Sequence, residues 1–223
     1  NGLRFWDLIQ PFFMFIVGVA MPLSFSKRMG KGESYNRVLR HMAFRSFILL
    51  ILGWMLSCIS HERIIWQFQN VLAQLSVTIM ISFLVIRKPF QYQIAVSLGL
   101  LLLTEIIYRL FWVEGFNDPF TVDQNFGAWI DLHAFGSLSK GHWVTFNAIP
   151  TAAHTIWGVL AGQMLMGNKT NKKKFVFLVI AGVIALAVGC SSQRHKRSVI
   201  LFRRWDEPLV HIHFCTRWRR KVN

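Results

Sequence analysis

Four charged side chains lie inside segments that are otherwise apolar, and these residues are the best placed in the sequence to do chemistry. They are Asp7, Arg45, Glu105 and Arg109. Charges within apolar helices are costly and mark either function or a pairing partner. Glu105 and Arg109 are four residues apart and share a helix face, which predicts a self-neutralising ion pair or part of a polar site. Arg45 lies near the end of its segment and can reach the membrane surface, whereas Asp7 has only Arg4 as a nearby cation.

The composition indicates which elements must position these charges. The chain is 53% hydrophobic and 16% charged, whereas soluble domains carry about 25% charged residues. Backbone amides in lipid must be bonded within their own segment, so a crossing of about 20 residues is helical. The predicted fold is all-α, a polytopic transmembrane helix bundle of about six spans. The spans are Trp6–Phe25, Met42–Ile59, Val71–Ile86, Ile94–Trp112, Phe146–Met166 and Phe175–Gly189.

Lysine and arginine are distributed unequally between the two sets of connecting loops. The loops after the first, third and fifth spans carry eleven of these residues, and the opposite side carries three up to residue 145. Positive charge concentrates in cytoplasmic loops of membrane proteins. We therefore predict that residues 27–40, 87–93 and 167–174 are cytoplasmic and that the chain starts on the other side.

This orientation brings several polar residues to one depth. Asp7, Gln74, Glu105 and Arg109 all project to the outer half of the membrane, which predicts a site that opens outward. The outer segment 114–145 is long for a connector in a compact domain. It is interpreted either as a functional lid or as a solvated loop.

Other common sites are not indicated. The three cysteines, Cys58, Cys190 and Cys215, have no C-x-x-C spacing, so we predict neither a disulfide framework nor a metal site. Glycine-rich nucleotide loops, H-E-x-x-H and G-x-S-x-G are absent from the sequence. We expect no nucleic-acid partner.

The first 18 residues carry a longer pattern, N-G-L followed by D-L-I-Q-P-F-F-M-F-I-V-G. This resembles W-N-G-L … D-L-x-x-P-x-F-x-F-I-x-G of the heparan-α-glucosaminide N-acetyltransferase family and its bacterial relatives. Weaker matches follow in the same order and extend the resemblance over residues 1–189, although Ala73-Gln74 replaces Gln-Arg of the family. They are Arg45-Ser46-Phe47, residues 70–78, residues 145–150 and Gly158-x-x-x-Gly162.

The resemblance implies an acyltransferase that takes acetyl from cytoplasmic acetyl-CoA and delivers it to an amino sugar or glycan across the membrane. The family histidine precedes W-N-G-L, so we expect it before Asn1 and expect this piece alone to be inactive. Asp7 would then support that histidine by orienting it or stabilising its charge. The cytoplasmic lysines and arginines either hold CoA phosphates or serve topology alone. The residues predicted to bind substrate are Asn1, Gln74, Glu105, Arg109 and Asn147.

The predicted location is a bacterial inner membrane, with lipid as the surrounding partner. Association into a homo-oligomer is left open. The main rival class is a non-enzymatic transporter, in which Glu105, Arg109 and the outer loop form a binding or permeation site. A helix bundle acting only as a scaffold is a third class, although it has no need of converging charges.

The segment 190–223 differs in character from the membrane part, residues 1–189. It holds nine of the 25 Lys and Arg residues, and it follows a span that should exit on the outside, against the charge rule. Basic arms of this kind bind membrane surfaces or nucleic acid, and His211-x-His213-x-Cys215 resembles an incomplete metal site. We prefer a third interpretation, in which this tail is translated out of frame.

Overall fold

The computed structural model describes residues 5–62, 64–119, 121–139, 142–167, 170, 172, 174–184 and 187, with side chains from residue 9 onward. The chain divides into two compact units, Asn1–Gly167 and Asn168–Asn223. All regular structure among the described residues is helical, so the all-α prediction is confirmed. The predicted out-of-frame tail, residues 190–223, lies outside the described residues.

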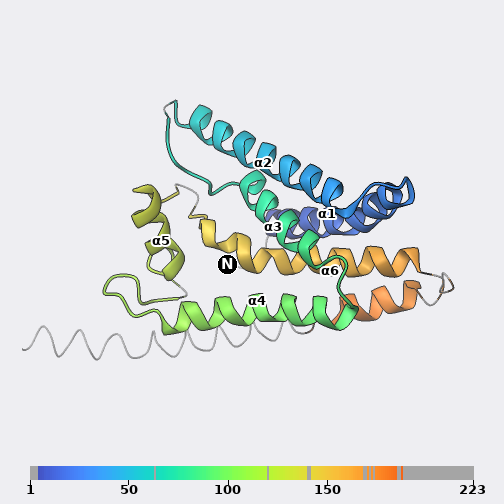
Figure 1. The fold of residues 1–223 in the computed structure, drawn as a ribbon. Coiled ribbons are helices and arrows are strands. Elements are labelled where there is room, and N and C mark those ends of the chain that lie inside the picture. The colour runs from blue at the N-terminus through green and yellow to red at the C-terminus, as the bar shows by residue number, and fades with distance from the viewer. Residues whose placement is uncertain are drawn as a thin grey trace, which may run out of the picture. The chain divides into compact units, whose positions relative to one another are not determined.

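The first unit is a bundle of helices (Figure 1). A small helix, α5, lies at the end of this bundle where α2 and α4 end and α6 begins, and we call this the α5 end. The elements are α1 (Phe5–Gly30), α2 (Tyr35–Ser60), α3 (Val71–Val85), α4 (Phe90–Leu110), α5 (Phe126–Phe135), the 3-10 helix η1 (Thr145–Asn147) and α6 (Ala148–Met166).

The seam between α1 and α6 is closely packed because glycines let the backbones meet. A Cβ atom added at Gly158 would lie 2.2 Å from the carbonyl oxygen of Phe15, and one added at Gly162 would lie 2.4 Å from that of Val19. Residue numbers rise together along both helices, so α1 and α6 run parallel. Small residues four apart allow the same approach between membrane helices. The G-x-x-x-G pattern of α6 is therefore a packing surface.

The pairing of α2 with α3 depends on one asparagine. The side-chain oxygen of Asn70 caps α3 by accepting the Ala73 backbone N–H at 2.9 Å. Its amide nitrogen donates to the Gly53 carbonyl at 2.8 Å and to the Ser57 hydroxyl at 3.0 Å. One side chain thus starts α3 and fixes it against α2.

The first unit has the polarity of a membrane protein rather than that of a soluble one. Large apolar side chains are exposed along α1, α2 and α4, including Phe12, Ile16, Phe44, Phe47 and Leu102. Polar side chains are buried instead, including Gln74, Thr78, Ser82, Gln93 and Thr155. An apolar exterior removes the cost of contact with lipid, whereas polar groups must find partners inside.

The predicted count of about six spans is not supported. Three helical segments among the described residues are long and apolar enough to cross a membrane: Ile9–Gly30, Tyr35–Ser60 and Phe90–Leu110. Helix α3 has 15 residues, and the apolar helix Lys174–Ile184 is also short. Helix α6 has 19 residues but carries Thr, His and Gln side chains and two glycines, which lower its hydropathy. Counting apolar runs in the sequence therefore overestimated the number of membrane spans, because some of these runs are buried inside the bundle.

Candidate functional site

Gln74, one of the predicted substrate-binding residues, lies inside the bundle between α3 and α1. Its side chain is 2% exposed, and its Oε1 accepts a hydrogen bond from Nε2 of Gln10. Asp7 lies in the first turn of α1, three residues before Gln10, and its side chain is outside the described part, as is Asn1. The structure therefore explains why Gln74 is polar, since a partner on α1 satisfies it.

The Glu105–Arg109 ion pair forms on α4 as the i, i+4 spacing predicts. Arg109 Nη2 lies 2.6 Å from Glu105 Oε1, and both side chains are about half exposed. They lie on the outward surface of α4, whereas Gln74 is buried. The pair and Gln74 therefore lie in different environments.

Asn147, the remaining predicted residue, ends η1 at the α5 end and is exposed. Its side-chain oxygen accepts a hydrogen bond from the Tyr108 hydroxyl at 3.4 Å. Tyr108 also packs against Phe126 and Phe146, with ring centroids 6.0 Å apart in both cases. These aromatic contacts attach α5 and η1 to the end of α4.

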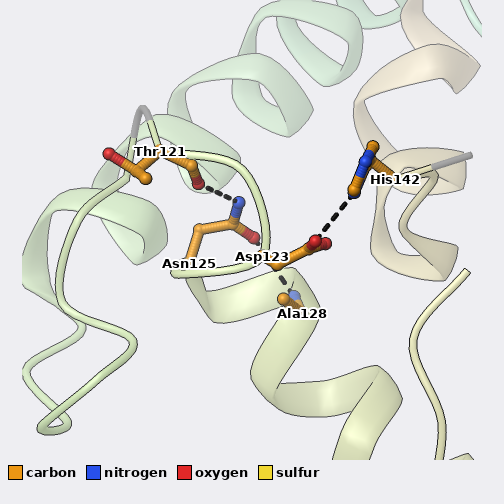
Figure 2. A network of polar contacts seen from close by, with 5 residues as sticks. All are labelled: Thr121, Asp123, Asn125, Ala128 and His142. Carbon is orange, nitrogen blue, oxygen red and sulfur yellow. Dashed lines mark hydrogen bonds and ion pairs between the residues drawn. The ribbon is translucent and has the colours of Figure 1, made fainter. Parts of the chain in front are cut away.

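The segment 114–145 contains α5 and, among its described residues, an ion pair that the sequence did not indicate. His142 Nδ1 lies 2.7 Å from Asp123 Oδ2 (Figure 2). Nearby, Asn125 caps α5 by accepting the Ala128 backbone N–H at 3.1 Å and donates to the Thr121 carbonyl at 3.0 Å.

A carboxylate bonded to Nδ1 can orient an imidazole so that Nε2 serves as a base. Both members of the Asp123–His142 pair are partly exposed, so a surface ion pair accounts for the geometry equally well. The two residues are 19 positions apart in the sequence, and no spacing rule relates them. Both have positive φ, 61° for Asp123 and 57° for His142, which a sequence does not reveal.

Asp131 is the most buried carboxyl among the described side chains, with 1% exposure. The Thr145 backbone N–H donates to its Oδ2 at 3.0 Å. Burial raises the pKa of Asp131, and the backbone N–H bond from Thr145, with the Thr145 hydroxyl and the Gln69 amide beside the carboxyl group, opposes part of this rise. Sequence analysis placed Asp131 only within the outer loop. Asp131 lies among the apolar residues of α5, but the sequence does not show that this helix packs against residues 67–69 and Thr145.

Between the middle parts of α1, α2 and α3 lies an open cavity of about 120 Å³. Arg45 contributes to its wall together with apolar side chains and Ser24. The Arg45 side chain is exposed, as are those of the neighbouring Phe44 and Phe47. Nearby, Arg28 lies 2.9 Å from His41 and 3.6 Å from Glu33. A guanidinium beside an apolar cavity and a basic loop would suit an anionic molecule with an apolar arm.

Comparison with known proteins gives a limited result. No protein-family model matches the chain. It is 42% identical over 53 residues to human heparan-alpha-glucosaminide N-acetyltransferase. The match covers 24% of this chain and 8% of the human protein, so it spans less than a tenth of that relative's length. Over about a quarter of its length, this membrane protein is therefore similar to an N-acetyltransferase.

Proposed function

We propose that the chain belongs to a membrane-embedded acyltransferase that moves acetyl from acetyl-CoA to an amino sugar or glycan. The observation that carries the proposal is the similarity to heparan-alpha-glucosaminide N-acetyltransferase. The amine nitrogen attacks the thioester carbonyl carbon, an amide bond forms, and the C–S bond breaks to release CoA as a thiol. The amine gives up one proton, which a base must accept.

The basic end of the bundle supports the choice of acyl donor. Acetyl-CoA is anionic through its phosphates and ends in a narrow, mostly uncharged arm. Arg28, Arg37 and Arg40 provide cations for phosphates, and the cavity beside Arg45 provides apolar walls for the arm. Acetyl-CoA would enter from this end, and the amino sugar would bind at the α5 end.

The proposal includes multi-pass insertion in a bacterial inner membrane, with the basic end in the cytoplasm. The charge distribution among the loops supports this orientation. Cysteines placed at Lys31 and Asp123 test it in intact cells. An impermeant thiol reagent is expected to label Asp123→Cys and to leave Lys31→Cys unmodified until the cells are opened. Reversed labelling would contradict the orientation.

Asp7 is proposed to support the base that takes the amine proton. Membranes from cells expressing the complete coding sequence would be supplied with radiolabelled acetyl-CoA and glucosamine, and labelled N-acetylglucosamine is the expected product. Asp7→Asn should lower turnover by about 10²-fold, within the range of general acid–base catalysis. Glu114→Gln is the matched control and should leave turnover unchanged. Sugar counterflow without acetyl transfer would instead identify a transporter.

A further inference from the structure

Three side chains from separate segments meet at the α5 end. Asp131 belongs to α5, Thr145 begins η1, and Gln69 precedes the cap of α3. The Thr145 backbone N–H bonds Asp131 at 3.0 Å, and the Thr145 hydroxyl and the Gln69 amide lie beside the same carboxyl group. Hereafter we call these three residues the Asp131 cluster.

Neighbouring contacts hold the cluster in place. Gln67 Nε2 donates to the Ser137 hydroxyl at 2.8 Å, and the rings of Phe68 and Phe135 lie 5.6 Å apart. These two contacts attach Gln67 and Phe68, which directly precede Gln69, to the C-terminal end of α5 and the residues after it. The position of Gln69 beside Asp131 is therefore fixed by packing and does not depend on a bond between them.

The cluster has unused hydrogen-bonding capacity. Four of its buried atoms have no partner within the described part of the protein: Asp131 Oδ1, Gln69 Oε1, Gln69 Nε2 and Thr145 Oγ1. Asp131 is 1% exposed and Gln69 is 8% exposed, so bulk water satisfies them poorly. About nine in ten or more of the buried polar groups in folded proteins have a hydrogen-bond partner. An ionisable carboxyl beside amide and hydroxyl groups that no described residue pairs needs a further polar partner.

We propose that the Asp131 cluster binds the amino group and an adjacent hydroxyl of an amino sugar. The identity of this ligand rests on the proposed acyltransferase function. The cluster offers both kinds of group: an ionised Asp131 and the Gln69 carbonyl only accept, the Gln69 amide nitrogen only donates, and the Thr145 hydroxyl does both. An ammonium group is a donor only and also neutralises the buried carboxylate. The Gln69 amide can then donate to the neighbouring hydroxyl.

If an amino sugar is the ligand, the site should bind it more tightly than a neutral sugar. A site that holds only buried water would show no such preference. Replacing the amine by a hydroxyl, as in glucose, removes the charge that compensates Asp131. N-acetylation also removes that charge and adds bulk, so the acetylated product should leave. The site would therefore hold the acceptor before transfer and release it afterwards.

The test is a titration of the purified full-length protein in detergent with glucosamine, N-acetylglucosamine and glucose. Saturable binding of glucosamine is expected, with the other two sugars weaker by about tenfold or more, the loss expected for a hydrogen bond to a charged group. Asp131→Asn, Gln69→Leu and Thr145→Val should each weaken glucosamine binding by a similar factor. Thr155→Val is the matched control, because Thr155 Oγ1 is another buried hydroxyl without a described partner, about 15 Å along the helix from the cluster.

Two measurements keep the outcomes separate. Circular dichroism and gel filtration would show that each variant is folded, and Thr145→Val keeps the backbone bond if Asp131→Asn fails to fold. Glucosamine binding that none of the three substitutions weakens, or no sugar binding by the folded protein, would overturn the site and leave buried water as its occupant. Acetyl transfer with an unchanged KM for glucosamine in Asp131→Asn would also overturn it, while the acyltransferase would stand. Selective glucosamine binding without acetyl transfer would contradict the proposed acyltransferase function and leave the binding site standing.

Discussion

The α1–α6 seam and the α5 end differ in how their elements are held together and in whether polar groups are left without partners. Along the seam, glycines bring two backbones together, and an added Cβ at Gly18 or Gly158 would lie 2.2 Å from a carbonyl oxygen. At the α5 end, short elements are joined by aromatic rings, helix caps and ion pairs. Several buried polar atoms there have no hydrogen-bond partner among the described residues. Shape complementarity leaves no room for a ligand. Polar groups held by packing but not satisfied by it provide the specificity that a binding site needs.

The largest effect is expected from Gly158→Ala, which tests the seam. The new methyl group would meet the Phe15 carbonyl oxygen at 2.2 Å, so α1 and α6 must separate. Overpacking of this kind costs about 1–3 kcal/mol, and more where backbone must move. Thermal unfolding in detergent measures the loss. Gly99→Ala on α4 is the control, because nothing lies within 4 Å of its added Cβ, and equal losses in both variants would contradict the seam.

A smaller effect distinguishes two helix caps of the same type. Asn70→Ala removes the cap of α3 and two bonds to α2, so we expect a loss of about 1–2 kcal/mol from the whole bundle. Asn125→Ala removes the cap of α5, and its effect should stay within residues 118–145. Hydrogen exchange of the backbone amides separates global from local opening. A global loss in Asn125→Ala would show that the α5 end stabilises the bundle.

Asp131→Asn tests the α5 end through pH. The folded state raises the pKa of Asp131, so the folded protein holds this proton more tightly than the unfolded chain. Stability that is present below about pH 4, the ordinary pKa of Asp, is therefore lost as pH rises through the folded pKa. The ligand-free variant should be more stable than the wild type at neutral pH and should lack this part of the pH dependence. Melting temperatures across a pH series check this, and parallel curves would count against it.

The sequence predicted the helical class and the polarity of the molecule well, because apolar runs and charge distribution are local properties. It also predicted the Glu105–Arg109 pair, since spacing of four residues on one helix fixes that contact. It overestimated the number of spans, because an apolar run does not show whether it faces lipid or other helices. The Asp131 cluster and the Asp123–His142 pair were not foreseen. Gln69 is far from Asp131 in the chain, and Asp123 and His142 are 19 positions apart with no periodic relation. Only tertiary packing decides that Asp131 is buried while Asp123 is partly exposed.

The smallest effect is expected at Glu105, and it locates α4 relative to lipid. The Glu105–Arg109 pair is about half exposed, and pairs of this kind on a helix surface contribute about 0.3–0.5 kcal/mol in water. Glu105→Gln should therefore change the melting temperature very little if the end of α4 lies at the membrane surface. The same pair within hydrocarbon would matter far more, because water does not screen the attraction between the two charges there. Measuring Glu105→Gln both in detergent and in lipid bilayers separates the two cases, with Glu114→Gln in the loop beyond α4 as the control. A large loss of melting temperature in bilayers but not in detergent would show that this pair lies within the membrane and would contradict its position at the membrane surface.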